Sequence, residues 1–143
     1  MKHPRRVSAC LLAVFLLLSL LQALAASPNN HSTTVLFTHA LHSHFLPQPD
    51  GAGGESGGYA RLKTALDRER AAHPDALTLD GGDFSIGSLI QTLYTTQGAE
   101  LRTMGAMGYD AAAVGNHEFD HTGTGFAEML RAVTESGSRA PAL

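Results

Sequence analysis

The sequence contains no tryptophan and a single cysteine, Cys10, and aromatic residues make up only 6% of its 143 residues. One cysteine excludes a disulfide within the chain, so a buried core or a bound metal must stabilise the fold. Positive charge is also scarce, because 10 lysines and arginines face 13 aspartates and glutamates, a formal net charge of -3. This acidic balance makes the chain a poor candidate for binding nucleic acid or an anionic membrane surface.

A long hydrophobic run occurs only at the N-terminus. Residues 1–25 read MKHPRRVSACLLAVFLLLSLLQALA, with basic residues first, a leucine-rich core next, and small residues at Ala23 and Ala25. The core of about 16 residues is shorter than the roughly 20 that span a bilayer, and this order of parts is typical of a secretory signal. We predict a cleaved signal peptide over residues 1–25 and a short linker over residues 26–33.

The signal predicts export to the periplasm, the cell wall or the medium, with no stable membrane span after cleavage. An uncleaved N-terminal anchor is the alternative. The remaining residues, 34–143, are expected to form at most one domain, because 143 residues allow no more.

From Val35 onward the hydrophobic pattern alternates between strand and helix periods. Short apolar runs predict strands over 33–40, 75–83 and 109–115. Longer runs with near-helical spacing predict helices over 59–73, 97–107 and 125–136, and a loop rich in proline and glycine covers 46–58. Strands that alternate with helices favour right-handed crossovers and a parallel sheet covered on both faces. The sequence therefore predicts an α/β fold in the order β-α-β-α-β-α.

Polar side chains follow each predicted strand, in the segments THALHSH, LDGGDFSIGS and VGNHEFD. Because the carboxyl ends of parallel strands open on one edge of a sheet, the segments are expected to meet there. They deliver His42, Asp83, Asn116 and His117. Imidazole, carboxylate and amide oxygen suit manganese, zinc, iron or magnesium. Singly, each segment has an ordinary explanation, such as surface histidines, a turn at Asp83 or a helix N-cap at Asp120, but these explain the convergence poorly.

The blocks LHSHFLP, LDGGDFSIGS and MGYDAAAVGNHEFD resemble the first three motifs of the calcineurin-like metallophosphoesterases. Within that family they are most similar to the bacterial 5′-nucleotidase and UDP-sugar hydrolase branch, from about Val35 to the end of the sequence. The resemblance implies the N-terminal part of an αββα sandwich and a hydrolase that cleaves phosphate esters of nucleotides. It also implies two divalent ions (manganese, zinc, iron, magnesium or calcium), which clamp the ester while a metal-bound hydroxide attacks phosphorus.

The resemblance also implies a role for each candidate residue. His42 resembles a ligand of the first ion, Asp83 the carboxylate that bridges both ions, and Asn116 a ligand of the second. His117 resembles the imidazole that stabilises or protonates the leaving group, and Asp120 the carboxylate that orients it.

The first motif departs from the family pattern. Ala40 stands where the family has a ligand aspartate, and His39 stands where it has asparagine. Neighbouring strand residues point to opposite faces, so His39 is not expected to replace the missing carboxylate. His44 is not expected to be a ligand, and Glu118 is expected to be a structural residue of its loop.

Two later histidine motifs of the family, the last resembling Gly-His-any-His, are absent, as is its C-terminal nucleoside-binding domain. Three protein donors would then serve two dications, whereas a single zinc ion normally has three or four protein ligands. We therefore expect the sequence to be the front part of a longer protein, inactive by itself and unable to hold a two-ion centre. A non-catalytic metal- or phosphate-binding module, or a non-functional gene fragment, is the alternative.

Overall fold

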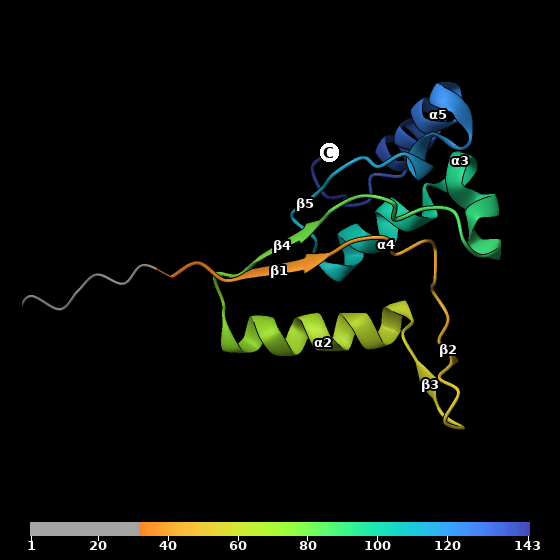
Figure 1. Cartoon of the computed structure of the whole chain (residues 1–143). Helices are drawn as coiled ribbons and strands as arrows, with labels where there is room; N and C mark the ends of the chain where they lie inside the picture. Colours follow the sequence, from red (N-terminus) through yellow and green to blue (C-terminus); the bar gives the residue numbers. More distant parts are fainter. Residues whose placement is uncertain (1–31) are drawn as a thin grey trace, which may run out of the picture. The chain divides into compact units, whose positions relative to one another are not determined.

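The structure is a computed structural model in which residues 32–143 are described. The predicted signal peptide and most of the predicted linker lie outside these residues. Strands β1 (Val35–Thr38), β4 (Leu77–Asp80) and β5 (Ala111–Ala112) form one parallel sheet in the order β1-β4-β5 (Figure 1). The strand order follows the order of the strands along the chain. The predicted parallel α/β fold is confirmed.

Helices connect the strands and follow the last of them (Figure 1). The described helices are α2 (Tyr59–Ala72), η1 (Leu89–Leu93), α3 (Tyr94–Gln97), α4 (Ala99–Met107), η2 (His117–Phe119) and α5 (Thr122–Glu135). The predicted loop over 46–58 contains a small antiparallel hairpin of β2 (Gln48–Pro49) and β3 (Glu55–Ser56). Gly108 ends α4 in a left-handed conformation with φ 88°, which glycine adopts without a steric penalty.

The observed strands are shorter than the sequence predicts. The sequence pattern predicts strands over 33–40, 75–83 and 109–115, whereas β1 already ends at Thr38. The chain turns there because Ala40 has φ 56°, a left-handed conformation that cannot continue a strand. Hydrophobic composition continues past the turn, so the sequence pattern alone does not mark where the strand ends.

The hydrophobic core lies between the sheet and its helices. Fully or nearly fully buried side chains include Leu66 of α2, Leu101 and Met104 of α4, and Met129 and Val133 of α5. Arg70 joins three elements at the edge of this core. Its guanidinium donates to the carbonyls of Met107 and Gly108 at 2.8 and 2.9 Å, and to the hydroxyl of Thr78 in β4.

The opposite face of the sheet is apolar and exposed among the described residues. Val35, Phe37 and Leu77 are 48%, 64% and 46% exposed, whereas Leu36, between the first two, packs against the core. Parallel sheets are normally covered on both faces. The described part thus has the layers of an incomplete sandwich. None of its helices is long and apolar enough to cross a membrane.

Candidate active site at the strand ends

The loops that follow β1 and β4 run side by side and extend the pairing of these strands. Three backbone hydrogen bonds join them, from the N–H groups of Ala40, His42 and Ser43 to the carbonyls of Gly82, Asp83 and Phe84, at 3.0, 3.1 and 2.9 Å. The side chain of His42 adds a fourth link, because its Nδ1 lies 2.9 Å from the carbonyl oxygen of Ile86. Both loops therefore keep a fixed register, although neither is a strand.

Several residues of these two loops have left-handed backbones. The φ angle is 56° at Ala40, 46° at His42, 52° at Ser43 and 56° at Asp83. This conformation costs a residue with a Cβ atom about 1–2 kcal/mol, and such strain gathers at functional sites. The strain thus coincides with the segment that the sequence marked as chemically interesting.

A buried carboxylate joins the loop after β4 to the loop after β5. Glu118 is fully buried, and its Oε2 accepts hydrogen bonds from the N–H groups of Asp83 and Gly115 at 2.9 and 2.7 Å. Its Oε1 accepts from the N–H and the hydroxyl of Ser85 at 3.0 and 2.9 Å. Hydrogen bonds to an ionised acceptor are about twice as strong as neutral ones. Glu118 therefore has the structural position in its loop that we expected.

Asp83 and His117 are brought into contact by this arrangement. The backbone N–H of His117 donates to Asp83 Oδ1 at 3.1 Å. Gly115 permits the approach, because a Cβ atom at this position would lie 2.2 Å from the same carboxylate oxygen. A side chain at position 115 would push Asp83 out of its place, so glycine is required here.

Two imidazoles face each other beside Asp83. The rings of His42 and His117 are 5.0 Å apart between centroids and meet edge to face at 74°. His117 Nδ1 lies 2.9 Å from Asp120 Oδ2, and this hydrogen bond raises the pKa of His117 above its ordinary value. Because Nδ1 of each ring is already hydrogen-bonded, to Ile86 in His42 and to Asp120 in His117, Nε2 is the atom left for other partners.

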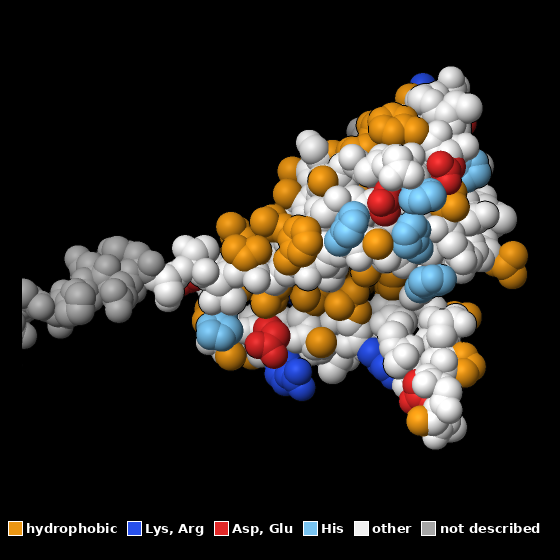
Figure 2. Space-filling model, in the orientation of Figure 1, with side chains coloured by type: hydrophobic (Ala, Val, Ile, Leu, Met, Phe, Trp, Pro, Cys, Tyr) orange, Lys and Arg blue, Asp and Glu red, His pale blue; other side chains and the backbone are white. Residues whose placement is uncertain are grey.

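The structure thus gathers four of the five predicted site residues through direct contacts: His42, Asp83, His117 and Asp120. The fifth, Asn116, is exposed and immediately precedes η2. Figure 2 shows histidine and acidic side chains grouped on one face of the molecule.

The metal site that the resemblance implies needs more donors than these residues offer. Ala40 offers no donor atom, and His39 Nδ1 is 3.0 Å from the carbonyl oxygen of Gly82. Within residues 32–143 there is no group of three or more His, Cys, Asp or Glu side chains that could hold an ion. A two-ion centre therefore does not fit the part of the chain that the structure describes.

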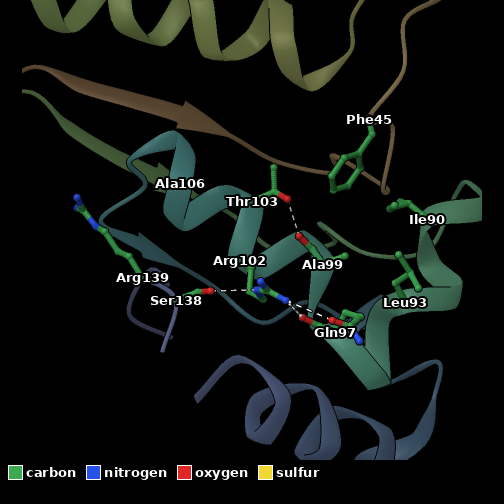
Figure 3. Close-up of a pocket in the computed structure, with 10 residues that line it drawn as sticks. All are labelled: Phe45, Ile90, Leu93, Gln97, Ala99, Arg102, Thr103, Ala106, Ser138 and Arg139. Carbon is green, nitrogen blue, oxygen red and sulfur yellow. Dashed lines mark hydrogen bonds between the residues drawn. The ribbon is translucent and has the colours of Figure 1, made fainter. Parts of the chain in front are cut away.

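A hollow of about 610 Å³ lies apart from these residues, beside η1, α3 and α4 (Figure 3). Phe45, Ile90 and Leu93 give it an apolar lining, and Arg102 lies along it with Nε 3.1 Å from the Ser138 hydroxyl. None of the five predicted site residues lines this hollow. The hollow is therefore separate from the candidate site residues.

The sequence reasoning missed the serines that hold the loops. Ser85 bonds to Glu118 across 33 residues of chain, and Ser43 bonds to Glu100 across 57. A lone serine after a strand is ordinary in any loop, so no local signal marks either residue. Their partners become visible only once the chain is folded.

The comparisons with known proteins agree with this fold. No family model matches the chain. The human 5′-nucleotidase is 38% identical over 122 residues, which cover 80% of this chain and 21% of that protein. The solved 5′-nucleotidase precursor of Thermus thermophilus has a TM-score of 0.64 at 32% identity, over 78% of this chain and 21% of its own.

A third comparison concerns the fold alone. The calcineurin-like phosphoesterase YfkN from Bacillus subtilis has a TM-score of 0.58 at 22% identity, covering 68% of this chain and 33% of its own. The shared fold and the sequence identity with 5′-nucleotidases identify the chain as a member of the calcineurin-like metallophosphoesterases. Within that family the chain belongs to the 5′-nucleotidase branch. It spans about a fifth of the length of the curated relatives, 21% of the human protein.

Proposed function

We propose that this chain is part of an exported phosphoesterase that hydrolyses phosphate esters of nucleotides or similar small molecules. The observation that carries the proposal is the contact of His42, Asp83 and the His117–Asp120 pair at the strand ends, in a chain related to 5′-nucleotidases. Export rests on the signal-like residues 1–25.

In this proposal His117 handles the proton of the reaction. Cleavage of a phosphate ester leaves an alkoxide, which is a poor leaving group unless a proton reaches its oxygen. Asp120 accepts a hydrogen bond from His117 Nδ1, fixes the ring and favours its protonated form. The proton on Nε2 is then available for the departing oxygen.

Asp83, His42 and Asn116 are the proposed donors toward a divalent ion, as the family resemblance implies. They do not make up a two-ion centre within the described residues, because Ala40 supplies no fourth group. This shortage favours a second candidate function, a non-catalytic module that binds an ion or a phosphate at the strand ends. The two functions differ in their need for His117.

The test is phosphate release from AMP and from a generic phosphate ester, measured on the gene product isolated from its native source and on the 143-residue chain. With His117→Ala, turnover by the native product should fall about 10²–10⁴-fold, the usual contribution of general acid catalysis. His44→Ala is the matched control, because His44 is an exposed histidine of the neighbouring loop, and it should keep turnover.

Full turnover without His117 would contradict the proposed proton transfer. Phosphate binding that survives in both variants, without any hydrolysis by the native product, would instead support the non-catalytic module.

A further inference from the structure

A second buried glutamate lies beneath the His42 turn. Glu100 is in the first turn of α4 and is fully buried, as is Ser43. The Ser43 hydroxyl donates a hydrogen bond of 2.7 Å to Glu100 Oε1. The other carboxyl oxygen, Oε2, is buried and has no hydrogen-bond partner among the described residues. Among the described residues, the carboxyl group of Glu100 is therefore hydrogen-bonded to one other side chain, that of Ser43.

Core packing does not explain a carboxyl group at this position. Glu100 lies next to Leu101 and near Met104, in a helix whose other buried residues are apolar or glycine. Burying a polar atom without a partner costs free energy, and apolar replacements of buried charged groups are often neutral or stabilising. Burial also raises the pKa of Glu100 above its ordinary value. A group this costly points to a task that leucine would not perform.

The turn above Glu100 requires support. His42 and Ser43 are consecutive left-handed residues, with φ 46° and 52°, although neither is glycine, asparagine or aspartate. Ser43 is held on three sides, because its N–H donates to the carbonyl of Phe84 at 2.9 Å and its own carbonyl accepts from the Ser88 hydroxyl. The third side is the hydrogen bond of its hydroxyl to Glu100.

We propose that Glu100 is a positioning residue, which holds the left-handed turn through the Ser43 hydroxyl and thereby sets the His42 imidazole against His117. The turn brings the His42 ring to two partners, the carbonyl of Ile86, which lies 2.9 Å from Nδ1, and the ring of His117, 5.0 Å away between centroids. The importance of this position for catalysis rests on the proposed function. The geometry itself does not depend on it.

The experiment reads the two imidazoles directly by nuclear magnetic resonance on the full chain. In the wild type, the ring protons of His42 and His117 should show cross-relaxation, because the ring centroids are 5.0 Å apart. In E100L the Ser43 hydroxyl has no acceptor, so we expect the cross-relaxation to fall at least about threefold. E100Q keeps an oxygen acceptor for Ser43, and we expect it to retain the wild-type signal.

Arg70→Ala is the stability control. It removes hydrogen bonds to Met107 and Gly108, at the end of α4 opposite Glu100, and to Thr78 in β4, and so destabilises the same helix without removing any hydrogen bond of Ser43. We expect its imidazole cross-relaxation to remain at the wild-type value. Ser43→Ala removes the donor of the same hydrogen bond. If E100L does not fold, the cross-relaxation is measured on Ser43→Ala instead.

A wild-type signal in both E100L and Ser43→Ala would overturn the proposal, as would an equal loss in Arg70→Ala. Neither ion nor phosphate ester is needed for this measurement. A failure of the proposed enzymatic function, seen as the absence of hydrolysis, is therefore distinguishable from a failure of this positioning role.

Discussion

Two buried glutamates hold the candidate site. Glu118 holds the loops after β4 and β5, and Glu100 holds the turn at His42 and Ser43. The two glutamates differ in the number of hydrogen bonds that their carboxylate oxygens accept. Glu118 receives four hydrogen bonds from Asp83, Ser85 and Gly115, so both of its oxygens are satisfied. Glu100 receives one, from Ser43, and leaves Oε2 without a partner. The side around Glu118 is thus a complete scaffold, whereas the side around Glu100 is less well satisfied.

The same division appears in the chemistry of the two sides. The loops held by Glu118 carry Asp83, His117 and Asp120, each with a polar contact to another site residue. The turn above Glu100 carries His42, but Ala40 has no donor group. The backbone at position 40 nevertheless has the left-handed conformation that aspartate and asparagine tolerate best among residues with a Cβ. Position 40 thus combines a backbone that suits a carboxylate residue with a side chain that has no oxygen.

The largest expected effect comes from removing Glu118, both of whose carboxylate oxygens accept hydrogen bonds. Glu118→Ala leaves the donors of Asp83, Ser85 and Gly115 without their acceptor inside the protein, and we expect the free energy of unfolding to fall by about 3–5 kcal/mol. Urea unfolding followed by circular dichroism measures this. Glu128→Ala, at an exposed position of α5, is the control and should change it by less than about 0.5 kcal/mol. Equal losses in the two variants would contradict the role of Glu118.

The second largest effect comes from adding a carboxylate at position 40, beside the turn that carries His42. Ala40→Asp adds a carboxylate at a position whose backbone already suits it, near His42, and we expect cobalt affinity to rise about 10–100-fold. Titration followed by the visible absorption of bound cobalt measures this without any assay of turnover. Ala60→Asp, on the exposed surface of α2, adds the same charge elsewhere and should leave affinity unchanged. A similar affinity in both variants would mean that position 40 does not face the site.

The smallest effect is the pH dependence of the free energy of unfolding that comes from Glu100, whose Oε2 has no hydrogen-bond partner among the described residues. Burial raises the pKa of Glu100, so the folded-state pKa lies above the unfolded-state value. The protonated Glu100 therefore contributes to the free energy of unfolding. This contribution is fully present below the unfolded-state pKa and is lost as pH rises through the folded-state pKa. Glu100→Gln does not ionise, so its stability advantage over the wild type should grow as pH rises from acid to neutral.

Urea unfolding of both proteins at a series of pH values measures that difference, and the other titrating groups cancel because the two chains share them. Glu128→Gln, at an exposed position, should show no such growth. A difference between Glu100→Gln and the wild type that is constant with pH would contradict the assignment.

Much of the fold could be predicted from the sequence, because its elements follow local periodicity. The helix predicted over 59–73 is observed as α2, Tyr59–Ala72, and the helix predicted over 125–136 begins somewhat earlier as α5. The helix predicted over 97–107 begins later, at Ala99, because Gly98 has φ 54° and ends α3 instead. The helical turns of η1 were not predicted, since LIQTL has no helical period long enough to recognise.

The candidate site was predicted in part. The sequence placed Asp83 and His117 at one sheet edge, and the structure joins them by a hydrogen bond of 3.1 Å. Their roles toward an ion and a substrate stay predictions. The sequence could not show Ser43 and Glu100 as partners, because a glutamate in the first turn of a helix is common and needs no partner in the core.

The sequence by itself determined the alternation of strands and helices, the parallel order of the sheet, and the chemical types of the groups at the strand ends. These follow from side-chain periodicity and from residue identity, which act over a few neighbours. Only the tertiary structure decided that Glu118 binds the Asp83 loop and that Glu100 lies under the His42 turn. Those contacts join residues 35 and 57 positions apart, and a hydrogen bond forms between such residues only where folding brings donor and acceptor within about 3 Å.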